Sequence, residues 1–236
     1  MDITKRRLFV ANNLFIFVMT AVMVTITLTF GSWAARKDNG PFAYWQHVVT
    51  FTILSNIFLG IIALVAAIIG HKRAKTNRPL PRKLLTWYLI ATTSGMLTCL
   101  TVVFFLAPVR AASGKDYFDM VLGPMFFLHF FDPVLAAITY IFLSGKSRTA
   151  AKDRFLSMLP PIIYAAPYII CVAIIHIWPD FYGLTFGGRY YLLFLVAIAF
   201  LFIVFGISSM LAFFHNKCAS KSSKSLDASV EKSLDT

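Results

Sequence analysis

An imidazole and a carboxylate lie three residues apart inside one long apolar run. Residues 127–133 read Phe-Leu-His-Phe-Phe-Asp-Pro, and His129 and Asp132 are the only polar side chains among them. A charge at the centre of a bilayer costs about 2.5–3.5 kcal/mol on insertion scales, so an ionisable pair inside a membrane span indicates a functional site. Pro133 has no N–H group to bond to the carbonyl four residues back, that of His129, and we therefore expect a kink in this span.

The composition predicts an integral membrane protein. Of the 236 residues, 58% are hydrophobic and 14% are charged, whereas a soluble domain carries about 25% charged residues. The fold class that follows is all-α, a polytopic six-helix transmembrane bundle in residues 1–216, and we expect the Ser/Lys-rich tail, 217–236, to be disordered. Six runs are long enough for the roughly 20 residues that a spanning helix needs, namely 8–33, 44–69, 84–105, 118–143, 155–178 and 190–214.

The distribution of Lys and Arg predicts the orientation of this multi-pass bundle. One set of loops, together with the two ends of the chain, carries most of the cationic residues: Lys5, Arg6, Arg7, Lys72, Arg73, Lys75, Arg78, Arg82, Lys83, Lys146, Arg148, Lys152, Arg154, Lys217, Lys221, Lys224 and Lys232. Because cytoplasmic loops are enriched in Lys and Arg, both termini are predicted to be cytoplasmic, with the bundle in the cell membrane. The net charge of +12 is then explained by topology and by contact with anionic lipid headgroups.

Several functional classes are not expected from this composition. Nucleic-acid binding needs basic and aromatic residues interleaved on a folded surface, which short loops do not offer. The cysteines Cys99, Cys171 and Cys218 have no C-x-x-C spacing, so neither a disulfide framework nor a metal site is predicted. We expect no cofactor, and the predicted partners are the lipid bilayer and a lipid substrate, with no prediction of oligomeric state.

Polar residues in the second span share one helical face. Thr52, Ser55, Asn56 and Gly60 are spaced at i, i+3, i+4 and i+8, which places them on the same side of a helix. Small and hydroxyl residues at such spacing usually mediate helix packing in membranes, and this is the simpler interpretation of Ser55, Asn56 and Gly60. The simpler interpretation of Thr52 is a hydrogen bond from its hydroxyl to the backbone carbonyl of Val48.

Thr52 and His129 are predicted to lie at similar depths. Both of their spans enter the membrane from the outer side, so Thr52 lies roughly 10 Å below Trp45 and His129 roughly 12 Å below Val121, at a rise of 1.5 Å per residue. If these two helices are neighbours, the hydroxyl and the imidazole meet in the outer half of the bilayer. A hydroxyl is a weak nucleophile unless a base activates it from within about 2.6–3.2 Å.

These motifs resemble a known group of membrane proteins. The segment FTILSN at 51–56, with His129 followed by Pro133, resembles the bacterial six-span Pr6Pr-type membrane proteins, which in turn resemble the androgen-induced and FAR-17a-like family. Members of that family are intramembrane threonine hydrolases that cleave fatty-acid esters of hydroxy fatty acids. The resemblance implies that Thr52 is the nucleophile and His129 the base, and that no metal or cofactor takes part.

Two supporting residues have alternative interpretations. Asp132, three residues after His129, either orients the imidazole as the third member of a triad does or accepts a hydrogen bond from a Tyr, Thr or Asn of another span. Asn56, one turn after Thr52, is the candidate donor to an oxyanion.

Two other functions remain open from the sequence. A small-solute transporter or proton relay could use His129 and Asp132, and a non-catalytic membrane scaffold is the third interpretation. The outer loop at residues 178–183 is rich in aromatic residues that are predicted to be interfacial anchors, with a lid over the bundle as the alternative.

Overall fold

The protein is built of helices. The computed structural model describes residues 3–31, 48–76, 78–145, 147–180, 182 and 188–234, and these contain no β-strand. The α-helices are α1 (Ile3–Ile26), α4 (Phe51–Lys75), α5 (Arg82–Thr101), α6 (Ala107–Ala112), α7 (Pro124–Phe126), α8 (Asp132–Leu143), α9 (Ala151–Leu156), α10 (Leu159–Ile169) and α11 (Tyr190–Leu234). The π-helical segments are η1 (Thr27–Gly31), η2 (Val102–Leu106), η4 (Phe127–Phe131) and η5 (Ile170–Ile174), and η3 (Phe118–Met120) is a 3₁₀ turn.

The all-α prediction is confirmed. Five described helical segments are long and apolar enough to cross a membrane: Ile3–Thr29, Phe51–Lys75, Arg82–Ala112, Ala151–Ile174 and Tyr191–Ser220. A shorter apolar helix, Phe127–Leu143, lies within the fourth predicted run. It begins nine residues later than expected, after a stretch of turns in which Gly114 and Gly123 have φ angles of +83° and +64°, a left-handed conformation that glycine adopts readily.

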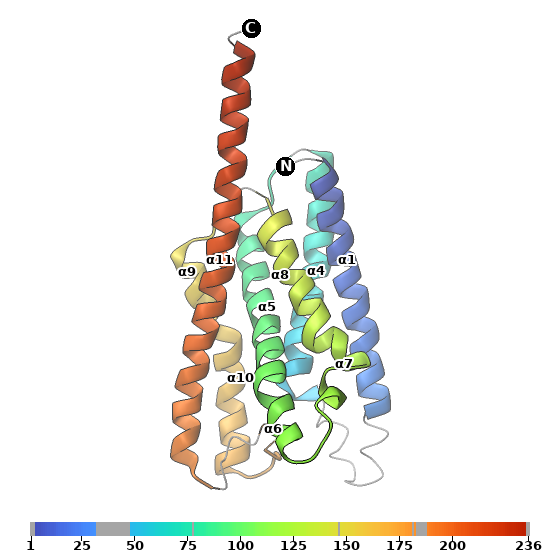
Figure 1. Ribbon diagram of the computed structural model, residues 1–236, viewed down its shortest axis with the longest axis vertical. Coiled ribbons are helices and arrows are strands. Elements are labelled where there is room, and N and C mark those ends of the chain that lie inside the picture. The colour runs from blue at the N-terminus through green and yellow to red at the C-terminus, as the bar shows by residue number, and fades with distance from the viewer. Residues whose placement is uncertain are drawn as a thin grey trace.

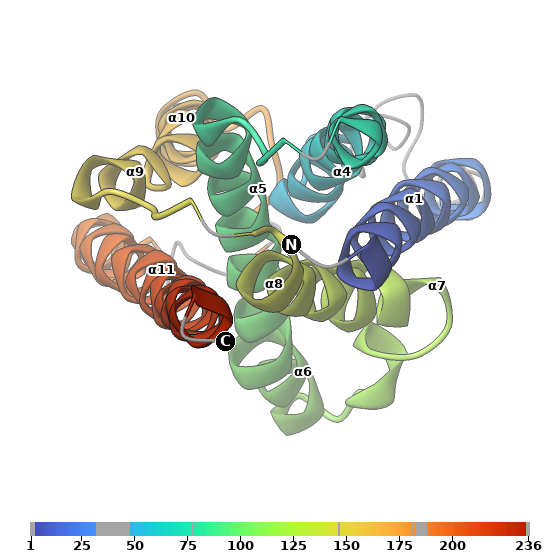
Figure 2. The ribbon, with the colours of Figure 1, turned by 90° about the horizontal axis from the view of Figure 1, so that it is seen from above.

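Helix α5 lies at the centre of the bundle. Seen from above, α1 and α4 lie to one side of α5, α10 and α11 lie to the other, and α8 packs between α5 and α1 (Figure 2). Three buried aromatic rings join the central helices. Tyr88 of α5 contacts Phe9 of α1 at 6.1 Å and Tyr140 of α8 at 5.9 Å between ring centroids. Helix α5 thus contacts α4, α8, η4, α10 and α11, which carry most of the site described below.

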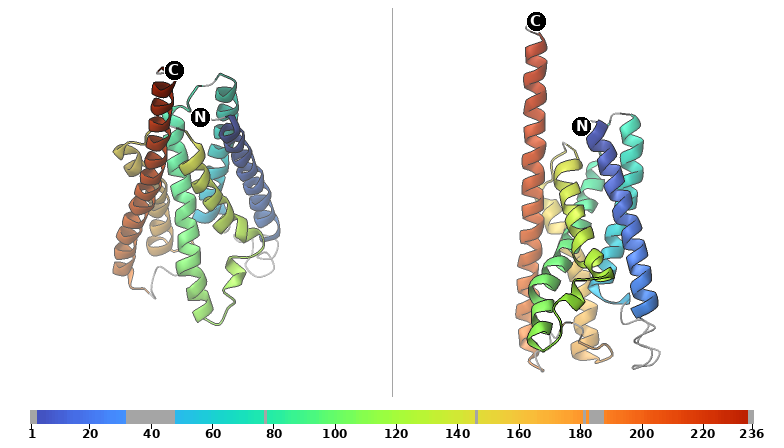
Figure 3. Two further views of the ribbon diagram at one scale, coloured as in Figure 1. Left: turned by 45° about the horizontal axis from the view of Figure 1, so that its top comes forward. Right: turned by 45° about the vertical axis from the view of Figure 1, so that its right-hand side comes forward.

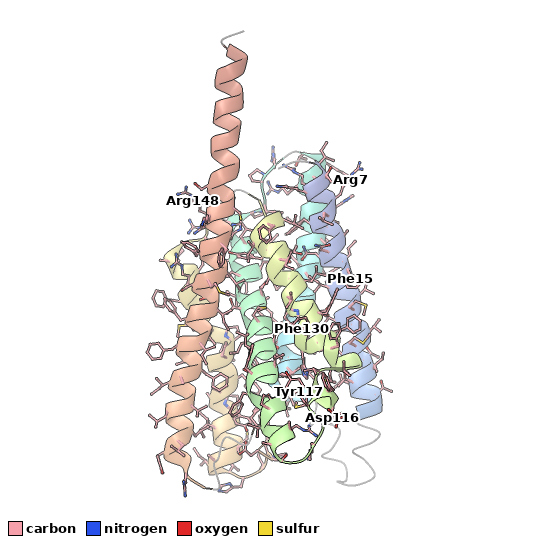
Figure 4. All side chains as sticks on the ribbon, in the orientation of Figure 1. Arg7, Phe15, Asp116, Tyr117, Phe130 and Arg148 are labelled. Atoms are coloured by element: carbon pink, nitrogen blue, oxygen red, sulfur yellow. The ribbon has the colours of Figure 1, made fainter. Side chains whose placement is uncertain are left out.

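The two ends of the chain lie at the same end of the bundle (Figure 1). Arg7 and Arg148 lie toward that end, and Asp116 and Tyr117 lie toward the opposite end (Figure 4). At the cationic end, Arg6 donates a hydrogen bond to the carbonyl of Arg73 at 2.9 Å, which holds α1 against the end of α4. The structure thus gathers the basic residues of distant segments on one side, as the loop pattern predicts.

Helix α11 is longer than its apolar part. Its apolar part ends at Ser220, but the helix continues through most of the predicted tail to Leu234 and projects beyond the other helices in both views of Figure 3. An isolated helical extension of this length is marginally stable in water. The predicted disorder of residues 217–236 therefore stays a prediction.

Cysteine labelling tests the predicted orientation. In a variant with Cys99, Cys171 and Cys218 replaced by Ser, we expect an impermeant maleimide to label Ser113→Cys on intact cells and to leave Thr76→Cys unlabelled. Both positions are exposed in the structure, so both should label after permeabilisation, which serves as the control. Labelling of Thr76→Cys alone on intact cells would contradict the orientation.

Candidate functional site

A π-helical turn lies directly before Pro133. In η4 the backbone N–H of Asp132 donates to the carbonyl of Phe127, five residues back, rather than to that of Leu128. The π-helical partner of the Leu128 carbonyl would be the N–H of Pro133, which does not exist. The carbonyl that loses its partner inside the helix is therefore that of Leu128 as well, one residue before the His129 carbonyl expected from the sequence.

Asn56 supplies the missing donor. Its Nδ2 donates to the Leu128 carbonyl at 3.0 Å and to the Thr52 carbonyl at 2.8 Å. Both hydrogens of this buried amide are then used, so Asn56 joins α4 to η4 and does not offer a donor to an oxyanion. The contact also confirms that the second and fourth spans are neighbours, as does the packing of Ile53 against Leu128.

The imidazole of His129 is held in one tautomer. Its Nδ1 lies 2.6 Å from the carbonyl oxygen of Met120, and because a carbonyl can only accept, Nδ1 must carry the proton. In the neutral ring, Nε2 is then an unprotonated acceptor, which is the form that a general base needs. His129 is only 4% exposed, and within the described part of the chain no hydrogen bond reaches Nε2.

Thr52 lies in the first turn of α4. Helix α4 begins at Phe51, where Thr50 is the N-cap and its hydroxyl accepts from the N–H of Ile53 at 3.5 Å. The hydroxyl of Thr52 makes no hydrogen bond with any described residue, so the predicted bond to the carbonyl of Val48 is not formed. Trp45, from which its depth was predicted, lies outside the described residues.

Thr52 is one of the residues that line a cavity. The cavity has a volume of about 340 Å³ and lies between α4, α5, α10 and α11. This volume is within the usual range for a small-molecule site, and no charged side chain is among the described residues that line it. Its lining is formed by Phe51, Thr52, Leu97, Thr98, Thr101, Val102, Phe105, Leu106, Pro161, Ile162, Tyr164, Ala165, Ala166, Tyr168, Ile169, Tyr182, Leu193, Val196, Ala197, Phe200 and Leu201.

Tyrosine side chains line one wall of the cavity. Tyr182, from the loop after η5, accepts a hydrogen bond from the N–H of Phe51 at 2.9 Å, and its ring packs on that of Tyr168 at 5.4 Å between centroids. Tyr168 in turn donates to Asp180 at 2.6 Å. Burial raises the pKa of Tyr182, so its hydroxyl remains neutral. Tyr182, in the loop predicted to hold interfacial anchors or to form a lid, thus lines the cavity, and the lid stays a prediction.

The structure brings Thr52 and His129 onto adjacent helices without a hydrogen bond between them. No hydrogen bond joins their side chains, and His129 is not among the lining residues of the cavity. Catalytic hydrogen bonds are often long without substrate and shorten when it binds. The arrangement therefore meets the requirement of neighbouring spans but not that of a direct hydrogen bond between the two side chains.

Asp132 bonds to α1 and not, as the triad interpretation requires, to the imidazole of His129. Its Oδ2 accepts from the hydroxyl of Thr20 in α1 at 3.0 Å, while Oδ1 has no hydrogen-bond partner in the described residues. This favours the second interpretation, in which Asp132 joins spans and the Met120 carbonyl orients the imidazole. Within the described chain, no three His, Cys, Asp or Glu side chains form a group that could hold a metal ion.

Sequence reasoning missed two elements of this region. The carbonyl of Met120 and the hydroxyl of Tyr182 approach the site from loops, and no periodic pattern marks them. A second polar region in the inner half of the bundle was also missed, where Asn12 of α1 donates to Thr139 of α8 at 3.0 Å. The adjacent Asn12 and Asn13 inside an apolar run are the signal that could have indicated it.

The contribution of the Asn56 bridge can be measured by a double-mutant cycle. We expect Asn56→Ala to lower the free energy of unfolding in detergent by about 1–3 kcal/mol, because the buried Leu128 carbonyl loses its donor. Pro133→Ala restores an N–H inside the helix and should therefore reduce the loss caused by Asn56→Ala. Asn12→Ala, which breaks a bond between two side chains, is the matched control and should show no coupling to Pro133→Ala. Equal losses from Asn56→Ala in both backgrounds would contradict this role.

Comparison with known proteins gives no relative. No family model, no curated protein and no solved structure matches this chain. The proposals that follow therefore rest on the geometry of the site and on the motifs quoted above.

Proposed function

We propose that the protein is a six-span protein of the cell membrane with both termini in the cytoplasm. The five long apolar helices and the shorter α8 segment support the number of spans. The gathering of basic side chains at the end where the chain begins and ends supports the orientation. In this orientation the cavity lies in the outer half of the bilayer, because α4 runs inward from Phe51.

We propose that the protein is an intramembrane lipid-ester hydrolase with Thr52 as its nucleophile and His129 as its base. The observation that carries this proposal is that the hydroxyl of Thr52 makes no hydrogen bond in the described chain and that Thr52 lines a cavity with no charged side chain among its described lining residues. The adjacent helix holds an imidazole whose Nε2 is the acceptor. Fatty-acid esters of hydroxy fatty acids are the substrate class that the motif resemblance implies.

In this mechanism the chain supplies every group. Nε2 of His129 takes the proton of Thr52, Oγ1 attacks the ester carbonyl, and Nε2 then gives the proton to the departing alcohol oxygen. A water molecule, deprotonated by the same nitrogen, then attacks the acyl carbon. The bond from that carbon to Oγ1 breaks, the acyl group leaves as a fatty acid, and Nε2 returns the proton to Oγ1. Because the amide of Asn56 is already used, we assign stabilisation of the oxyanion to the backbone N–H of Thr52 at the positive end of α4.

Transport through a proton relay is less well supported. A relay needs ionisable groups linked by hydrogen bonds, and within the described residues Asp132 bonds to Thr20 whereas His129 bonds to Met120. No hydrogen bond joins the two ionisable side chains. A non-catalytic lipid-binding scaffold differs from the hydrolase only in lacking turnover, so the experiment below separates the two.

Hydrolysis by purified protein in nanodiscs tests the proposal. With fatty-acid esters as substrates, we expect Thr52→Ala and His129→Ala each to reduce kcat at least 100-fold, and the double variant to be little worse, because the two residues act as one unit. Thr52→Ser should retain measurable activity. A fluorophosphonate probe should label Thr52 in the wild type, and the label should be lost in His129→Ala.

Thr101→Ala is the matched control, since Thr101 lines the same cavity and takes no part in the mechanism. It should retain most of the wild-type rate. Full activity of Thr52→Ala, or a covalent label on another residue, would disprove the assignment, and binding of the ester without turnover in the wild type would indicate the scaffold.

A further inference from the structure

The depth of Thr52 within the cavity follows from its neighbours. Ser55 of α4 shares a hydrogen bond with Thr98 of α5 at 3.0 Å between their hydroxyl oxygens, and the two helices run in opposite directions. Thr52, three residues outward on α4, is therefore level with Thr101, three residues outward on α5. Since α5 and η2 together line the cavity from Leu97 to Leu106, Thr52 lies level with its middle, and this level divides the cavity into an inner and an outer part.

The inner part is short. From the level of Thr101 to that of Leu97 is four residues, or about 6 Å at 1.5 Å per residue. Leu97 and Val204 belong to the buried core, and Phe200 packs against that core while also lining the cavity. Side chains of the core therefore form a floor immediately inward of Phe200.

The chemistry of the inner part admits only an uncharged chain. Leu97, Phe200 and Leu201 are apolar, and the hydroxyl of Thr98, at the side, already shares a hydrogen bond with Ser55. A buried charge here would have no partner among the described residues and would be costly. An extended acyl chain advances about 1.2 Å per bond, by analogy with an extended peptide backbone. A depth of about 6 Å therefore accommodates roughly five bonds of the acyl chain.

We infer that the inner part of the cavity measures the acyl chain of a neutral ester and accepts about four to six carbons inward of the carbonyl. This inference rests on the proposed function, because it places the ester carbonyl beside Thr52. The rest of the substrate lies in the outer part, between Phe105, Ile169 and Leu193. Phe200 is the residue that sets the limit, because its ring lies between the substrate chain and the core.

The test measures binding and turnover separately across a series of chain lengths. Alkyl ketones with 2 to 12 carbons on one side of the carbonyl, which cannot be hydrolysed, are added to the Thr52→Ala variant, and their binding is followed as a rise in thermal stability. We expect the rise to grow up to about six carbons and then to fall. Hydrolysis of esters of the same series by the protein with Thr52 intact should show the same optimum.

Variants of the floor move the limit in opposite directions. Phe200→Ala, and to a smaller extent Phe200→Leu, should shift both optima to longer chains by about two carbons or more, while Ala197→Leu, one turn outward on the same face, should shift them to shorter chains. Phe202→Ala is the matched control, because Phe202 is the same residue type on the same helix, does not line the cavity and is 74% exposed. It should leave both optima unchanged.

The outcomes separate this inference from the proposed function. If Phe200→Ala shifts the binding optimum but the wild-type protein hydrolyses no ester, the result supports the measuring site and refutes the hydrolase. Binding that rises steadily with chain length, as partitioning into detergent does, would overturn the measuring site. Hydrolysis with no optimum of chain length would support the hydrolase alone. Equal shifts from Phe200→Ala and Phe202→Ala would also overturn the role of Phe200.

Discussion

The geometry of the site depends on a backbone carbonyl that its own helix cannot satisfy. In the hydrocarbon core of a membrane no water is present to bond to a free carbonyl, so the group must find a donor within the protein. The π-helical turn in η4 and the missing N–H of Pro133 together leave the carbonyl of Leu128 without a partner in its helix. The amide of Asn56 provides the donor from α4, at 3.0 Å. This single bond fixes the second span against the fourth at the depth where the candidate site lies.

The hydrogen bond between Asn56 and Leu128 also positions the residues next to it, Thr52 and His129. Asn56 also donates to the carbonyl of Thr52, so the first turn of α4 and the turn that holds His129 are bound to the same amide. A π-helical turn inserts an extra residue and rotates the side chains that precede it relative to those that follow, and such turns often occur at functional sites. In this protein the rotation separates His129, which bonds to Met120, from Asp132, which bonds to Thr20.

The length and periodicity of the apolar runs allowed the helices to be predicted, because both are local properties of the sequence. The polar face of Thr52, Ser55 and Asn56 was correctly placed inside the bundle for the same reason. The partners of these residues could not be predicted, since they depend on the register of η4 and on contacts between distant segments. From the sequence, the free carbonyl was predicted at His129 on the assumption of a regular α-helix, and the π-helical turn before Pro133 adds the carbonyl of Leu128. The hydrogen bond from Phe51 to Tyr182 joins residues that are 131 positions apart in the sequence, and no local pattern predicts such a contact.

In the proposed mechanism, the hydrogen-bond partner of the imidazole affects how strong a base His129 is. In a serine-protease triad a buried carboxylate orients the imidazole and stabilises the imidazolium that forms during the reaction. Here a neutral carbonyl performs the first task, which avoids placing a second charge in the membrane. It performs the second task less well, because a hydrogen bond to a dipole stabilises a cation less than one to an anion does. Asp132, on the next turn of the same span, is bonded to Thr20 and so contributes to helix packing. In the proposed hydrolase, the burial of His129 places its hydrogen bond to Met120 in a low dielectric, where such a bond is stronger than in water.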